Sequence, residues 1–155
     1  MNGGSVNYPP PKGSGFPPMT NERILIMKVI KITTDSQIMV CEKKDDYSRD
    51  ELEELLDCEH VENVMPRRLY NELGVPKIDA IMLVDENGRY NRRKLNPVGS
   101  WLYETDIHNI PIVGDILVAG FSGEAGICGM DEKLFNELYC RLERIANAFN
   151  SEKTK

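Results

Sequence analysis

Two apolar runs in the second half of the chain constrain the fold more than any other feature. Residues 78–84 have the pattern of a central strand, and residues 112–121 form a second strand that is interrupted once by a Gly-Asp pair. Between them, residues 88–103 contain four basic side chains and no acidic one, although the whole chain carries a net charge of −6. The sequence therefore predicts a buried sheet that carries a basic segment.

Three other segments predict strands. Residues 24–32 begin with a continuous apolar run and then alternate, which is typical of a largely buried strand. A Thr-Thr-Asp-Ser turn leads to a second strand over residues 37–41, so these two segments predict a hairpin. Residues 60–65 predict a short strand that ends at Pro66, because proline cannot donate a hydrogen bond to a neighbouring strand.

A second hairpin is expected after the central strand. Residues 85–88 read Asp-Glu-Asn-Gly, and the Asn-Gly pair suits the positive φ values of a tight turn. This turn predicts that the chain reverses into a strand over residues 89–94, which would place the basic side chains on a hairpin.

Two helices are expected. Ser48 and Glu51 have the spacing of a capping box, and three leucines supply an apolar stripe on the short acidic helix that follows. Asp131 is a candidate cap for a long amphipathic helix that ends the chain. Its apolar side chains recur at helical spacing: Leu134, Leu138, Leu142, Ile145 and Phe149.

Together these elements predict a single α+β domain over residues 23–150, with a mostly antiparallel, twisted sheet of five or six strands. One short acidic helix and one long C-terminal amphipathic helix complete it. Residues 1–22 are Gly- and Pro-rich and are expected to be a disordered tail. Residues 151–155 are expected to fray.

Composition narrows the possible functions. No apolar run approaches the roughly 20 residues that span a bilayer, and the first residues lack the basic and apolar regions of a secretory signal, so a cytoplasmic location is expected. The four cysteines form no C-x-x-C pair, which predicts reduced thiols, no metal and no cofactor. An acidic chain is also a poor nonspecific binder of nucleic acids.

The order of these elements resembles a small, uncharacterised domain family found in bacteriophages and bacterial mobile elements, mainly of Firmicutes. The most specific matching pieces are Asn96 and Pro97 with Gly99, and the Ile-Val-Gly-Asp sequence of residues 112–115. The resemblance covers about residues 27–149 and brings no established catalytic residues. It implies an accessory protein that counters host defence in the host cytoplasm by binding or sequestration.

The basic segment is the candidate site. Guanidinium groups suit phosphate oxygens, and Tyr90 or Trp101 would stack on a base. The alternative is a structural role, in which the basic side chains pair with the acidic helix and Trp101 packs in the core. The residues expected to contact an anion or a partner are Arg67, Arg68, Arg89, Arg92, Arg93, Lys94, Asn96 and Trp101.

Three functions follow as hypotheses. The leading one is a non-enzymatic protein that binds a host protein or sequesters a small, nucleotide-like ligand, and it allows a homo-oligomer. The alternative is a nucleotide-processing enzyme that holds phosphates on the basic hairpin and uses His108 as acid or base. A third is a regulatory or structural protein whose acidic helix, through Glu53 and Glu54, binds a basic partner.

Overall fold

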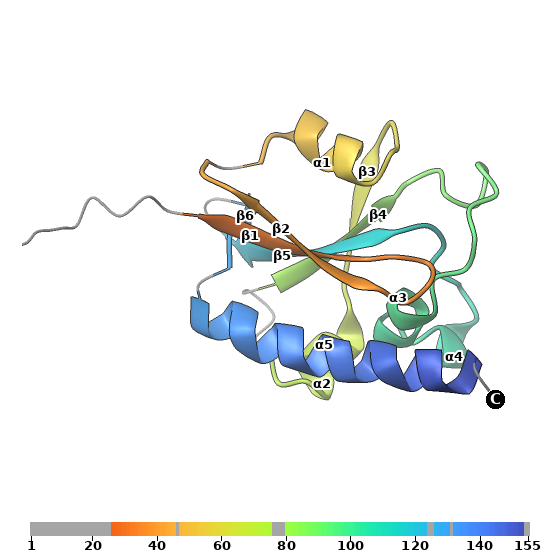
Figure 1. Cartoon of the computed structure of the whole chain (residues 1–155). Coiled ribbons are helices and arrows are strands. Elements are labelled where there is room, and N and C mark those ends of the chain that lie inside the picture. Colours follow the sequence, from red (N-terminus) through yellow and green to blue (C-terminus); the bar gives the residue numbers. More distant parts are fainter. Residues whose placement is uncertain (1–25, 46, 76–79, 124–125, 131, 154–155) are drawn as a thin grey trace, which may run out of the picture.

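The protein is built from three layers (Figure 1), with a central sheet between a single short helix on one face and several helices on the other. The computed structural model describes residues 26–45, 47–75, 80–123, 126–130 and 132–153. The predicted tail over residues 1–22 lies outside the described residues, as does the predicted helix cap Asp131.

All strand pairs of the sheet are antiparallel, and their order is β2-β1-β5-β4-β3, with β6 also paired to β5. This confirms the predicted α+β fold with an antiparallel sheet, and β4 and β5 are central, as their apolar sequences indicate. The strands are β1 (Met27–Ile32), β2 (Ile38–Lys43), β3 (Val61–Val64), β4 (Ala80–Asp85), β5 (Ile116–Ser122) and β6 (Gly126–Cys128).

Side chains of the central strands alternate between two separate cores. On β5, Ile116 and Val118 belong to the core beneath α5, whereas Leu117 and Ala119 belong to the core beneath α1. Both sets are fully buried, which explains why this strand is apolar throughout rather than alternating with polar residues. Each large aliphatic side chain buried in this way contributes about 1.5–3 kcal/mol to stability.

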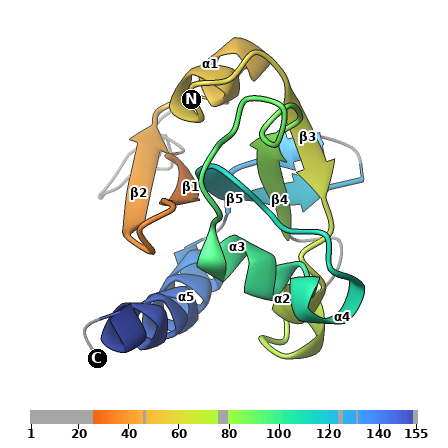
Figure 2. The ribbon, with the colours of Figure 1, turned by 90° about the vertical axis from the view of Figure 1, so that its right-hand side faces the viewer.

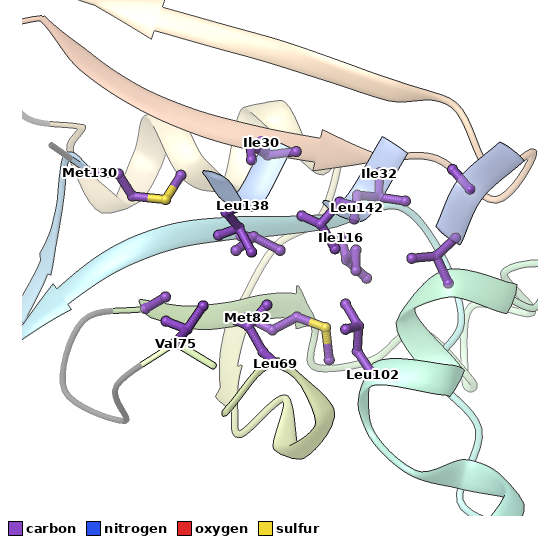
Figure 3. Close-up of a cluster of buried hydrophobic side chains, with 14 of the residues drawn as sticks. Ile30, Ile32, Leu69, Val75, Met82, Leu102, Ile116, Met130, Leu138 and Leu142 are labelled. Atoms are coloured by element: carbon purple, nitrogen blue, oxygen red, sulfur yellow. The ribbon is translucent and has the colours of Figure 1, made fainter. Parts of the chain in front are cut away.

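The C-terminal helix α5 (Glu132–Lys153) covers the larger core, as its apolar repeat predicts. Figure 3 shows Leu138 and Leu142 of this helix beside Ile30 and Ile116 of the sheet. On the other face, α1 (Arg49–Leu55) begins with the predicted capping box, in which Ser48 and Glu51 bond each other's backbone amides. Hydrogen bonds from Lys43 and from the Ser48 amide lower the pKa of Glu51 to about 2.

Three short helices were not expected from the sequence: α2 (Arg67–Asn71), α3 (Pro97–Leu102) and α4 (Thr105–His108). They lie on the α5 side of the sheet (Figures 1 and 2). Each has six residues or fewer, which is too short for a helical repeat to be visible in the sequence.

The predicted hairpin into residues 89–94 is wrong. Residues 86–92 form turns, and the neighbours of β4 are β5 and β3. In this loop the residue with a left-handed backbone is Arg92, whose φ is 58°. The Asn-Gly pair, which was expected to have positive φ values, does not have them. The Asp85 carboxylate accepts a hydrogen bond from the Asn87 amide at 2.9 Å, which curls the chain into a compact loop instead of a second strand.

The glycine-rich connection after β5 contains a further short strand. Within it, β6 pairs with the end of β5, so that Gly120 lies opposite Cys128. A Cβ atom on Gly120 would lie 2.8 Å from the carbonyl oxygens of Cys128 and Gly129, so only glycine allows this close approach of the backbones.

The buried amide of Asn96 joins three parts of the fold. Its Nδ2 atom donates to the carbonyl oxygens of Ile32 at 3.0 Å and Gly114 at 2.9 Å, and its Oδ1 atom accepts from the Gly99 amide at 2.8 Å. Asn96 is fully buried and caps α3, with Pro97 as the first helical residue. The Asn-Pro-Val-Gly sequence therefore holds α3 against the end of β1 and the turn before β5.

Replacing Asn96 with Ala is expected to lower the free energy of unfolding by about 3 kcal/mol or more, because it leaves two buried carbonyl groups and one amide without hydrogen-bond partners. Urea unfolding measures this change. Asn96→Asp, which keeps an acceptor for Gly99 but no donor for the two carbonyls, is expected to be destabilised as well. Asn71→Ala, at an exposed position of α2, serves as the control. It should change the free energy of unfolding by no more than about 0.5 kcal/mol. Equal effects of Asn96→Ala and Asn71→Ala would contradict this role of Asn96.

Candidate functional site

The structure divides the eight predicted site residues into two groups. Arg68 and Asn96 are buried, and Arg93 and Trp101 are partly buried, each with partners inside the protein. The other four have exposed side chains, and these side chains form no hydrogen bond or ion pair with any described residue: Arg67, Arg89, Arg92 and Lys94.

Arg68 ties three helices together. Its guanidinium group donates to both carboxylate oxygens of Asp106 at 2.7 and 2.8 Å, and to the Trp101 carbonyl at 2.9 Å. It also pairs with Glu72 at 3.1 Å and lies over the Trp101 ring, 5.0 Å from the centroid. These contacts join α2 to α3 and α4, and they occupy one face of the Trp101 ring.

Arg93 holds the loop after β4 against the end of α1. Its Nε atom donates to the buried carboxylate of Asp85 at 3.1 Å, and its Nη2 atom donates to the Asp57 carbonyl. The Asp85 side chain is only 2% exposed, so its charge needs this cation close by. Arg93 thus has the structural role that the sequence left open as an alternative.

A continuous groove runs beside the edge strand β3. Two adjoining hollows of about 390 and 280 Å³ form it, and both are lined by Glu62 and Val64 of β3 together with Tyr103 and Ile110. Its walls are β3, the loop after β4 and the chain from the end of α3 to the start of β5, which lie together at one side of the molecule in Figure 2. We call this feature the β3 groove.

Exposed apolar side chains line the β3 groove. Tyr90 is 88% exposed, Ile110 48% and Met65 45%, although each is a large side chain. Arg67 lines one hollow and Arg89 the other. Arg67, Arg89 and Tyr90 were singled out in the sequence, whereas Met65 and Ile110 were missed because nothing in a single sequence distinguishes an exposed apolar residue from a core residue.

His108 shapes one wall of the β3 groove. Its Nε2 atom lies 2.6 Å from the Tyr103 carbonyl, and its Nδ1 atom accepts a hydrogen bond from the Ile110 amide at 3.2 Å. A neutral ring that accepts at Nδ1 carries its proton on Nε2, which therefore donates to Tyr103. Both nitrogens of His108 are thus engaged with the backbone of groove residues.

A third hollow, of about 720 Å³, adjoins the loop after β4. It is lined by Asp57, Glu59 and Cys58 as well as by Arg93 and Tyr90. Two acidic side chains and an arginine already bound to Asp85 make this hollow a poor site for an anion.

Comparisons with protein-family models, with curated proteins and with solved structures found no match to this chain. The resemblance to a phage-borne family therefore stays a prediction. Among the described residues, no helix is long and apolar enough to cross a membrane, and no group of three or more potential ligands is placed to hold a metal ion.

The ion pair of Asp106 with Arg68 predicts a pH-dependent contribution to stability. The hydrogen bonds from Arg68 hold the pKa of Asp106 below its ordinary value, so the folded state binds that proton more weakly than the unfolded chain does. Wild type should therefore be more stable than Asp106→Asn at neutral pH. The difference should disappear as pH falls below the ordinary range of an aspartate, through the lowered pKa of Asp106.

Thermal unfolding of the two proteins across this pH range measures the effect. Asp45→Asn, which removes an exposed carboxylate without an ion pair to a described residue, is the matched control and should lack this dependence. A stability difference for Asp106→Asn that stays constant down to the lowest pH would show that the ion pair contributes nothing.

Proposed function

We propose that this protein is a non-enzymatic binding protein that holds a partner protein in the β3 groove. In a phage or mobile element, the partner is a host defence protein, and binding by this chain counters its activity. The observation that carries the proposal is the groove itself, where exposed Tyr90, Ile110 and Met65 lie beside two arginines without partners among the described residues.

The composition of the groove suits a protein partner. Large apolar side chains that are exposed by nearly half or more cost free energy in water, and covering them with a partner recovers it. Tyrosine and arginine are the side chains most often found where binding energy concentrates, and Tyr90 with Arg89 and Arg67 supplies both. The groove is open and extended along β3, which favours a segment of chain over a compact small molecule.

Several features weigh against a nucleotide or phosphate in the same place. The exposed carboxylates of Glu62 and Glu86 line the groove and would repel a phosphate group. One face of the Trp101 ring already lies against Arg68. His108, the proposed acid or base of the enzyme alternative, has both ring nitrogens in hydrogen bonds to the backbone. A binding role for the groove is therefore the better supported function.

Affinity capture from host extract tests the proposal. Tyr90→Ala combined with Ile110→Ala removes the two most exposed apolar side chains of the groove and is expected to weaken capture of a specific partner at least about tenfold. Ile26→Ala, which removes a side chain that is 50% exposed and lies outside the groove, is the matched control and should capture as the wild type does.

Two results would contradict the proposal. In the first, the groove variant still binds the partner, whereas Glu53→Lys combined with Glu54→Lys does not. This result would assign binding to α1. In the second, native mass spectrometry shows a small molecule retained by both the wild type and the groove variant but lost in Arg92→Ala combined with Arg93→Ala. This result would assign the function to the basic loop.

A further inference from the structure

The edge strand β3 has a residue in its middle whose backbone is open to a partner. The Glu86 amide donates to the His60 carbonyl at 2.9 Å, and hydrogen-bonded pairs alternate along an antiparallel ladder. Glu62 and Val64 therefore bond to β4, whereas the N–H and C=O groups of Asn63 point away from the sheet. Asn63 is exposed, and no other described residue forms a hydrogen bond with these two groups.

The rest of this edge is protected against indiscriminate pairing. The strand has only four residues, the Val61 carbonyl accepts a hydrogen bond from the Arg49 side chain at 3.1 Å, and Pro66 follows shortly after the strand ends. Short length and proline are usual means of keeping edge strands from aggregating. An added strand therefore gains few backbone hydrogen bonds here, and its side chains must supply much of the affinity and the specificity.

The open backbone of Asn63 faces part of the β3 groove. The smaller hollow, of about 280 Å³, is lined by Asn63 and Met65 at the edge of the sheet and by His108 and Ile110 from the other wall. A strand that bonds to Asn63 would therefore lie along this hollow. Every second side chain of that strand would point onto the same face as Val64, where apolar surface is exposed.

The charges on this face are unbalanced at the other end of β3. The exposed carboxylates of Glu62 and Glu86 line the larger hollow, and neither forms an ion pair with a described residue. Arg89 lines the same hollow, but no ion pair joins it to either carboxylate. A basic side chain placed opposite Glu62 would lie beside uncompensated negative charge, and opposite charges on facing residues stabilise a pair of strands.

We infer that the partner of the β3 groove contributes an extended segment that pairs antiparallel with β3 at Asn63 and has the pattern apolar-x-basic. This inference rests on the proposed function. The middle residue exchanges two hydrogen bonds with Asn63, and antiparallel pairing is both the more stable arrangement and the one used throughout this sheet. The preceding apolar residue then lies opposite Val64 and the following basic residue opposite Glu62, so both point onto the groove face.

An NMR titration of the isotope-labelled full chain with a synthetic peptide tests this pairing. The probe is acetyl-Ser-Thr-Ile-Thr-Arg-Thr-Ser-amide, in which isoleucine and arginine flank the threonine expected opposite Asn63. The peptide should shift the amide signals of residues 62–65 and 103–112. Methylating the backbone nitrogen of the middle threonine removes the N–H group that donates to the Asn63 carbonyl, and it should weaken binding at least about tenfold.

The matched control is the same peptide methylated at the backbone nitrogen of its arginine. That N–H group points away from β3 in the inferred pairing, so this peptide should bind as the unmethylated one does. Equal affinities of the two methylated peptides would overturn the pairing at Asn63, and so would an unmethylated peptide that shifts no groove signal. Neither result bears on whether Tyr90→Ala combined with Ile110→Ala loses the captured partner, so this inference and the proposed function fail separately.

A charge exchange tests the basic position of the pattern. Glu62→Arg should weaken binding of the peptide about threefold or more, and replacing the peptide's arginine with glutamate should restore binding to this variant. Glu54→Arg, at an exposed position of α1, is the matched control and should bind the original peptide as the wild type does. Equal binding of the original peptide by the wild type and Glu62→Arg would overturn the basic position.

Discussion

The buried side-chain amide of Asn96 is the interaction on which the arrangement of the rest depends. It connects the end of β1, the turn before β5 and the first turn of α3 through three hydrogen bonds, all inside the core. Because α3 is seated there, the chain that follows it returns past Tyr103 and Ile110 to form one wall of the β3 groove. A polar residue at the centre of the fold thus determines where the β3 groove, the proposed binding surface, lies.

The basic segment illustrates how a cluster in sequence becomes divided in space. Arg93 turns inward because Asp85, at the end of a buried strand, needs a cation, and Arg68 turns inward because Asp106 and the Trp101 carbonyl meet it from α4 and α3. The exposed remainder is spread over the loop after β4 and the start of α2. Two of these side chains, Arg67 and Arg89, line the groove beside its apolar side chains, and in the proposed function they would serve as specificity contacts for a protein partner rather than as a phosphate clamp.

Local sequence signals predicted the parts of the fold that local physics determines. The apolar runs of β4 and β5, the capping box of α1 and the repeat of α5 are each complete within a few neighbouring residues. The hairpin after β4 failed because Asp85 and Arg93 form a compact loop, and this pairing depends on the position of α1. The β3 groove could not be predicted, since its walls come from three separate segments and its apolar residues resemble core residues in sequence.

Hydrogen–deuterium exchange of the wild-type protein, free and bound to the captured partner, tests whether the β3 groove is the binding surface, because it locates the bound surface without altering a side chain. If the partner lies in the groove, exchange slows on binding in residues 62–65, 86–90 and 103–112, which form the walls of the β3 groove. Exchange that slows instead over α1, or over residues 91–94 alone, with the groove walls unchanged, would contradict it.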